Sequence, residues 1–408
     1  MRNEHIGKTT VENNSENLAA DCAKCGACAP VCPVFRAEGR ESLTARGRMY
    51  LLTQGDQARP SSILADIFAC CLLCGACEQV CPRQLPITKL IVEARSHFPL
   101  WQRPAASLRQ AATDTVLAHP LLLEGLVRAG ISLKHLLALP TNSGLRLRLG
   151  LLEEQRAALP LLPESKLQPD DRGLTYFVGC LARHVQPSIA TATEKLLHQC
   201  GLTAQIPAAQ SCCGLATWSS GNLAQARVQA QRNIAAFTGT GAILTSCASC
   251  SSHLRSYPSL FADKDPWQQR AQAFAYRVRE FTAFFAEYLP QITGKTQKQR
   301  VFYHDPCHLR FTPGGMENPR RLLRKRGLEI VEPDAGPCCC GQGGLFHVAY
   351  PATAAKVFAR CSCQALAGKP ASITSTCSGC LLQYQQELVR QGEKIRVAHL
   401  ALLLAEAD

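Results

Sequence analysis

The sequence of 408 residues has no uninterrupted apolar run that reaches the roughly 18 residues needed to suggest a membrane span. Its nearest candidate, residues 115–140, is interrupted by His119, Pro120, Glu124, Arg128 and Lys134. We therefore expect any membrane contact to be peripheral, on the cytoplasmic face of the inner membrane. The polar start of the chain also lacks the apolar stretch of a signal peptide, which favours the reducing cytoplasm.

Aromatic residues are scarce at 6% and do not alternate with Lys and Arg, so we expect no nucleic-acid partner despite the net charge of +13. A glycine-rich dinucleotide fingerprint is also missing after every predicted strand. Without such a fingerprint or another flavin signature, we do not expect this chain to bind a hydride-accepting cofactor. Any step that transfers a hydride is therefore expected to take place on a partner protein.

Cysteine, by contrast, is abundant, with 23 residues in the chain. A secreted disulfide scaffold is a short chain without a large core, whereas this chain has 46% hydrophobic residues and room for several domains. Eighteen of the cysteines fall into two patterns, each of which occurs twice. Such repetition favours a protein that carries electrons on metal clusters.

The first pattern, CxxCGxCxxxCP, occurs at residues 22–33 and 71–82. In this pattern three cysteines bind one [4Fe–4S] cluster and the fourth binds the cluster of the other motif. The predicted ligands of the first cluster are therefore Cys22, Cys25, Cys28 and Cys81. Those of the second cluster are Cys32, Cys71, Cys74 and Cys77. Two zinc sites are the alternative, although zinc does not require this interleaved pattern.

The segment between the two motifs has helical patterns at residues 46–52 and 63–68 and no pattern typical of a strand. We therefore predict an all-α, ferredoxin-like domain over residues 1–100. Residues 101–168 are rich in Leu, Ala and Arg and are interrupted by proline, which predicts a string of short helices. This basic linker is either a solvated connection or a docking surface for a partner or for anionic lipid.

The rest of the chain alternates short β patterns with helical ones and predicts two Rossmann-like α/β domains with parallel sheets, at residues 169–295 and 296–408. Each contains the second pattern, C…CCG…CxxC. The first copy comprises Cys180, Cys212, Cys213, Cys247 and Cys250. The second comprises Cys307, Cys339, Cys340, Cys377 and Cys380. Near-identical spacing in the two copies, with the same gap of 31 residues before the CC pair, identifies Cys338 as the additional cysteine of the CCC run.

Several of these cysteines directly follow predicted strands. Because the carboxyl ends of parallel strands lie at one edge of a sheet, the cysteines of each copy can converge there. Glycines would let the backbone pass close to a bound cluster, and the candidates are Gly214, Gly341, Gly343 and Gly344. Five thiols nevertheless exceed the four corners of a cubane cluster.

The C…CCG…CxxC motif resembles the cysteine-rich CCG domain of the heterodisulfide reductase B subunit. That resemblance implies that each set of five cysteines holds an opened [4Fe–4S] cluster, with a cubane as the alternative, and hence one or two further clusters. The whole order of domains resembles the glycolate oxidase iron-sulfur subunit family. This family also includes the iron–sulfur partners of D-lactate dehydrogenases and the C subunit of anaerobic glycerol-3-phosphate dehydrogenase. The sequence CPVF followed by Glu41 and ARGRMYLL favours the glycolate or D-lactate branch.

The resemblance implies an oxidoreductase subunit that passes electrons from an FAD-binding dehydrogenase subunit towards quinone or another carrier. A thiol–disulfide reductase that works on its own CCG cluster is the alternative, because both copies of the motif are complete. His304 and His308 flank Cys307 and are candidates for hydrogen bonds to a cluster, with His253 and His347 weaker candidates. The five remaining cysteines are expected to be small buried hydrophobic residues.

Overall fold

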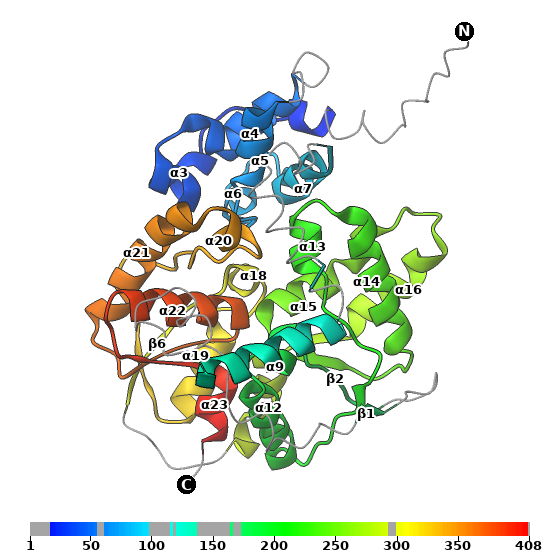
Figure 1. Cartoon of the computed structure of the whole chain (residues 1–408), viewed down its shortest axis with the longest axis vertical. Coiled ribbons are helices and arrows are strands. Elements are labelled where there is room, and N and C mark those ends of the chain that lie inside the picture. The colour runs from blue at the N-terminus through cyan, green and yellow to red at the C-terminus, as the bar shows by residue number, and fades with distance from the viewer. Residues whose placement is uncertain are drawn as a thin grey trace.

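The computed structural model describes residues 17–54, 61–97, 115–116, 120–136, 164–165, 173–292 and 299–406. A helical N-terminal segment lies against one end of two adjoining α/β units, and the second unit contains the C-terminus (Figure 1). The N-terminal segment is all-helical over its described residues, as predicted. Its helices are α2 (Cys28–Val31), α3 (Pro33–Glu38), η1 (Glu41–Leu43), α4 (Ala45–Leu52), α5 (Ser62–Ala69), α6 (Ala76–Gln79) and α7 (Ile87–His97).

The helix starts of this segment follow from local chemistry. Thr44 caps α4, because its side chain accepts a hydrogen bond from the Gly47 amide, and Ser61 caps α5 in the same way through Leu64. Cys32 precedes α3, and Pro33 occupies the first turn, where its missing amide costs no hydrogen bond. The two CP pairs of the motifs therefore do not act alike, since Pro82 begins no helix.

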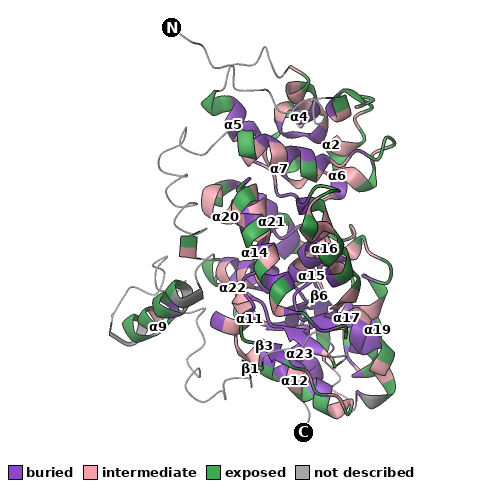
Figure 2. Cartoon of the chain, turned by 90° about the vertical axis from the view of Figure 1, so that its right-hand side faces the viewer, coloured by how far each residue is buried: buried purple, intermediate pink, exposed green. Residues whose placement is uncertain are grey.

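The predicted linker lies mostly outside the described residues. Its described part contains α9 (Pro120–Leu136), which packs against the first α/β unit, and the short strand β1 (Glu164–Ser165). Figure 2 shows α9 at one edge of the molecule with much of its surface exposed. The predicted domain boundaries stay predictions.

In the first α/β unit, β2, β4 and β5 form a three-stranded sheet in the order β2-β4-β5. Strand β3 pairs with β1, and a single bridge between Thr175 and Gln205 places β3 beside β2. All the pairings are parallel. The strands are β2 (Thr175–Phe177), β3 (Ile206–Pro207), β4 (Ile243–Thr245) and β5 (Val278–Glu280). The helices are α11 (Cys180–His184), α12 (Ser188–Gln199), α13 (Leu215–Ser219), α14 (Leu223–Ala236), α15 (Ala248–Arg255), η5 (Tyr257–Leu260), α16 (Pro266–Arg277), α17 (Phe281–Phe285) and η6 (Ala286–Gln291).

The second unit repeats this topology as the parallel sheet β7-β6-β8-β9. Its strands are β6 (Arg300–Tyr303), β7 (Glu329–Val331), β8 (Ser372–Ser375) and β9 (Arg396–His399). Its helices are α18 (Cys307–Arg310), α19 (Glu317–Lys325), α20 (Phe346–Ala349), α21 (Pro351–Ala367), α22 (Ser378–Arg390) and α23 (Leu400–Ala405). The predicted internal duplication and parallel α/β class are confirmed. The fourth strand of each unit, β5 and β9, was missing from the sequence prediction.

The two units share one apolar core, which contains buried residues of both sheets and of the helices between them. Buried residues are purple in Figure 2. Helix α12 of the first unit packs on α23 of the second, and α17 packs on α19. Fully buried side chains from both halves, such as Leu196 and Leu404, meet in this core. Because burial of apolar surface is the main stabilising contribution, the two units are expected to fold as one body.

The N-terminal segment contacts both units. Helix α3 packs against α21, the Tyr350 hydroxyl donates to Asp66 Oδ1 over 2.8 Å, and Thr353 donates to Glu38 over 2.9 Å. On the other side, the guanidinium of Arg95 donates to the backbone oxygen of Ser219. These contacts bring the thiols of the first pattern close to those of the second.

Candidate metal centres

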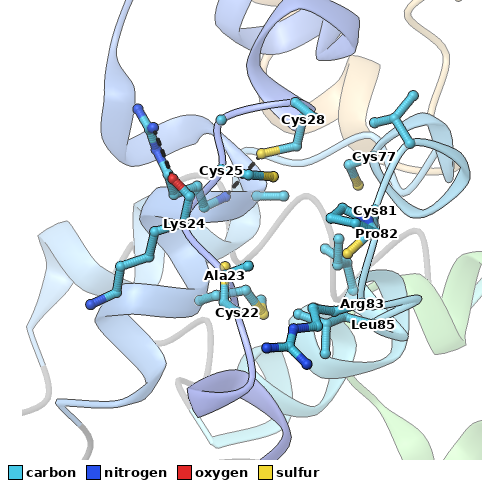
Figure 3. A pocket seen from close by; sticks show the side chains of 17 residues that line it. Cys22, Ala23, Lys24, Cys25, Cys28, Cys77, Cys81, Pro82, Arg83 and Leu85 are labelled. Carbon is cyan, nitrogen blue, oxygen red and sulfur yellow. Dashed lines mark hydrogen bonds between the residues drawn. The ribbon is translucent and has the colours of Figure 1, made fainter.

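The first thiol site lies in the N-terminal segment. Figure 3 shows the sulfur atoms of Cys22, Cys25, Cys28, Cys77 and Cys81 around one open space. Cys25 is exposed, so this site reaches the protein surface. The Cys28 sulfur accepts a hydrogen bond from the Arg46 amide over 3.4 Å.

The second thiol site lines a neighbouring cavity with Cys71, Cys74, Cys77 and, from the other motif, Cys32. Amides donate to two of these sulfurs, Phe35 to Cys32 over 3.5 Å and Leu73 to Cys71 over 3.4 Å. The two cavities group the thiols in the way that crossed ligation requires, and Cys77 lies on the wall between them. Assignment of each thiol to a particular cluster stays a prediction.

Two arginines that the sequence prediction missed hold the loop of the second motif. Arg48 is buried and donates to the backbone oxygens of Leu43, Ile67 and Cys70. Arg95 donates to the backbone oxygens of Phe68, Ala69 and Cys71. Because an unpaired buried carbonyl is costly, these two side chains fix the path of residues 67–71. Arg48 lies in the predicted helical pattern at residues 46–52, whereas Arg95 lies outside both predicted patterns, so the sequence prediction held no signal for it.

The first CCG copy gathers at the carboxyl edge of its sheet, as the strand pattern predicted. Cys180 begins α11 after β2, Cys212 and Cys213 follow β3, and Cys247 and Cys250 lie at the start of α15 after β4. Thiol–thiol contacts join Cys212 to Cys180 and to Cys213, and join Cys250 to Cys213 and to Cys247. All five thiols therefore form one connected group.

The second copy repeats this arrangement. Cys307 contacts Cys339, Cys339 contacts Cys340, and Cys380 contacts both Cys340, over 3.1 Å, and Cys377. The Cys380 amide donates to the Cys377 sulfur over 3.5 Å. In both copies the second thiol of this series of contacts, Cys212 or Cys339, accepts hydrogen bonds from the two thiols beside it.

These hydrogen bonds hold the pKa of Cys212 and of Cys339 well below that of an ordinary thiol, whereas the pKa of the donating thiols is raised. In the N-terminal sites, burial raises the pKa of Cys74 and of Cys77. The protein alone thus favours few thiolates among many thiols. Bound metal supplies the positive charge that ionises coordinating thiols, so these all-sulfur donor sets fit iron–sulfur clusters.

The four thiol sites lie in succession. Cys74 and Cys339 pack in one cluster of buried residues, which connects the second N-terminal site to the second CCG copy. Cys247 and Cys377 occupy equivalent positions in the two copies and contact each other, which connects the second copy to the first. The order in space is therefore N-terminal segment, second copy, first copy, and it differs from the order along the chain.

Two predicted histidines lie beside the second copy. A ring nitrogen of His304 lies within 4.8 Å of the sulfurs of Cys340 and Cys380. His308 Nδ1 is 2.9 Å from the Ser249 hydroxyl, which is in turn 3.2 Å from the Cys377 sulfur. Burial lowers the pKa of His304 to about 4, so its imidazole is neutral at pH 7.

Of the two weaker candidates, His253 lies beside the first copy on α15 and His347 lies on α20. His253 packs between Trp218 and Tyr257, and burial lowers its pKa to about 3. His347 Nδ1 lies 3.2 Å from the backbone oxygen of Gly344.

The five remaining cysteines differ in environment. Cys70 and Cys361 are buried as expected, Cys200 and Cys338 are half-buried, and Cys363 is exposed. Cys361 contacts the Tyr384 hydroxyl over 3.1 Å and the additional thiol of Cys338. The expectation of a buried hydrophobic role therefore fails for Cys363, which lies on the solvent side of α21.

Comparison with known proteins agrees with this architecture. A 4Fe-4S dicluster domain matches residues 18–85, and a cysteine-rich domain, CCG, matches residues 174–255 and 301–385. A probable glycolate oxidase iron-sulfur subunit from Bacillus subtilis is 29% identical, covering 97% of this chain and 95% of the relative. Lactate utilization protein A is 31% identical in Anoxybacillus flavithermus, with 57% of this chain and 98% of the relative covered. The Bacillus cytotoxicus protein of that name is 32% identical, with the same coverage.

Fold and thiol sites together define an iron–sulfur protein in which a dicluster domain precedes two cysteine-rich α/β domains. The chain belongs to the family of glycolate oxidase iron-sulfur subunits and lactate utilization protein A. This confirms the resemblance inferred from its motifs. Among the helices that the structure describes, none is long and apolar enough to cross a membrane.

Proposed function

We propose that the chain is the electron-transfer subunit of a cytoplasmic, FAD-linked 2-hydroxy acid dehydrogenase complex that oxidises glycolate or D-lactate. The substrate is oxidised on a flavoprotein partner, and the electrons leave towards a quinone or another carrier. The observation that carries this proposal is the succession of four adjoining thiol sites through the molecule.

The proposed ligands are those predicted from the two patterns. Cys22, Cys25, Cys28 and Cys81 hold one [4Fe–4S] cluster, and Cys32, Cys71, Cys74 and Cys77 hold another. Each CCG copy holds one further cluster with its five cysteines. Bound iron–sulfur clusters accept and release single electrons.

The protein positions the cysteine sulfurs, stabilises negative charge on them and excludes water from most of the CCG thiols. Backbone amides that donate to Cys28, Cys32, Cys71 and Cys377 stabilise negative charge on these sulfurs. Most CCG thiols are buried, which keeps water from them, whereas Cys25 at the opposite end of the succession is exposed. This asymmetry supports the surface around Cys25 as one point of electron exchange with a partner.

Iron analysis tests the proposed ligands directly. Four clusters predict about 16 iron atoms per chain in protein purified without oxygen, whereas the N-terminal pair alone predicts about 8. A content near 8, or stoichiometric zinc, would contradict clusters in the CCG copies.

Capture of the native complex tests the proposed role. The captured complex should contain an FAD protein and should reduce a dye with glycolate or D-lactate. The alternative role, disulfide reduction by the CCG clusters, requires the isolated chain to reduce a small disulfide without any flavoprotein. Dye reduction with glycerol 3-phosphate in place of a hydroxy acid would move the assignment to that branch of the family.

A further inference from the structure

A cleft with basic side chains on its walls opens where α3 of the N-terminal segment meets α21 of the second α/β unit. Its walls include residues of α3, α18, α21 and the loop that leads to the CCC run. The polar lining residues used below are Arg36, Arg310, Cys338, Cys339, Lys356 and Arg360.

The cleft has a strong excess of positive charge. Four cationic side chains line it, and no carboxylate does. Lys356 is paired with Glu38 at the rim, at 3.1 Å. Within the part of the chain that the structure describes, no carboxylate pairs with Arg36, Arg310 or Arg360. The Nε of Arg310 is buried without a hydrogen-bond partner. Three guanidinium groups thus share one cleft with little compensation of charge.

We propose that this cleft binds a small oxyanion that carries at least two negative charges, on carboxylate or phosphate groups. Guanidinium groups bind such oxygens through paired hydrogen bonds, and several of them around one cleft repel each other until an anion is bound. Arg36 belongs to the N-terminal segment, and the other three cationic side chains belong to the second α/β unit. A bound anion would therefore connect the N-terminal segment to the second unit.

The cleft lies beside two of the thiol sites. Cys339 forms part of its wall, and residues on both sides of Cys32, Val31 and Pro33, form another part. Arg310, three residues after Cys307 on α18, places its positive charge in the same cleft. An anion in the cleft would oppose this charge and make reduction at the adjacent sites less favourable. Binding of the anion does not depend on the proposed function. The effect of the anion on reduction of the clusters does rest on the proposed function.

Titration calorimetry on the full, iron-loaded chain tests binding, with inorganic phosphate and malonate as separate probes at constant ionic strength. We expect one saturable site per chain for which the two probes compete, and the tighter probe identifies the preferred group. Arg36→Gln and Arg360→Gln should each weaken binding about tenfold or more, the usual loss for a charge-assisted hydrogen bond. Arg321→Gln, which removes an exposed charge on α19 outside the cleft, should not.

Iron content is measured for every variant so that a folding defect is not mistaken for lost binding. Absence of saturable binding to the wild-type chain, or equal weakening in Arg321→Gln, would overturn the anion site. A redox titration followed by paramagnetic resonance supplies the second measurement. Phosphate should lower the reduction potential of at least one cluster in the wild-type chain but not in Arg36→Gln.

The two measurements separate this site from the proposed function. Unchanged potentials with intact binding would overturn the coupling to the clusters and leave the anion site standing. Phosphate binding by a chain that holds no more than about 8 iron atoms would refute the four-cluster proposal but not the cleft.

Discussion

One glycine allows the close approach of the second-motif loop of the N-terminal segment to the second CCG copy. Gly343 has φ +48°, and a Cβ atom added there would lie 2.5 Å from Leu72 Cδ2 and 3.3 Å from Leu72 Cα. Leu72 follows directly on Cys71, and it is buried. Gly343→Ala should therefore push the CCG loop away from the loop of the second motif.

The size of the effect follows from two contributions. A side chain in the left-handed region costs about 1–2 kcal/mol. Overpacking against Leu72 should add about 1–3 kcal/mol. Gly392 provides a matched control, because it has φ +79° and a Cβ there would meet no atom within 4 Å. Gly392→Ala should show the first contribution alone.

The assay is thermal unfolding of the iron-loaded chains without oxygen, with the midpoints of both variants compared with that of the wild-type chain. The additional loss in Gly343→Ala should lower its midpoint below that of Gly392→Ala by roughly 1 °C per kcal/mol, because the shift per kcal/mol falls as the chain becomes longer. Leu72→Ala removes the clashing methyl group, so Gly343→Ala should cost less in that background. Equal midpoints for the two glycine variants, or no change in the Leu72→Ala background, would refute this account of the contact.

Three further predictions concern other sites. Arg320 forms a buried pair with Asp305 at 2.8 Å, so Arg320→Met should destabilise the chain by about 3–5 kcal/mol, as measured by chemical unfolding. Arg324→Met removes an exposed pair and should cost less than about 1 kcal/mol; similar losses would contradict the assignment. Burial raises the pKa of Glu280 from 4.5 to about 7, so its contribution to stability is full below pH 4.5 and is lost as the pH rises through 7. Glu280→Gln should remove this pH dependence and stabilise the chain at pH 8 by up to about 3 kcal/mol; parallel profiles of unfolding midpoint against pH would argue against it. Cys25→Ala, which leaves no ligand atom at this position, should reduce iron content by up to about 4 atoms, and an unchanged iron content would exclude Cys25 as a ligand.

Much of the fold followed from the pattern of strands and helices. The runs at residues 174–180 and 301–307 were read correctly because they are apolar and end in a cysteine after the strand. Strands β5 and β9 were missed because they are short and contain charged residues, as in Val278–Glu280. Both lie at the end of their sheet, and parallel pairing with β4 and β8 makes them strands. Pairing of this kind depends on tertiary structure, which local propensity does not contain.

For the candidate sites, too, local features could be predicted from the sequence and tertiary contacts could not. Spacing grouped the thiols of each motif, because turns and strand ends are local features. The succession of the sites could not be predicted, since it depends on contacts such as that between Cys247 and Cys377. The expectation that Gly343 allows close approach to a cluster was incomplete, because its nearest neighbour is Leu72 of the N-terminal segment. Arg310 was missed because nothing local distinguishes it from other surface arginines.

The contact between the two ends of the chain also has a consequence for synthesis on the ribosome. Asp66 and Tyr350 are 284 residues apart in the chain. At about 5–20 residues per second, the N-terminal segment waits roughly 15–60 s for the helices that will cover it. During this interval its second motif, including Leu72, lacks its cover, and apolar surface remains open to aggregation. A nascent chain of this kind benefits from early delivery of iron and sulfide or from a chaperone that protects this face.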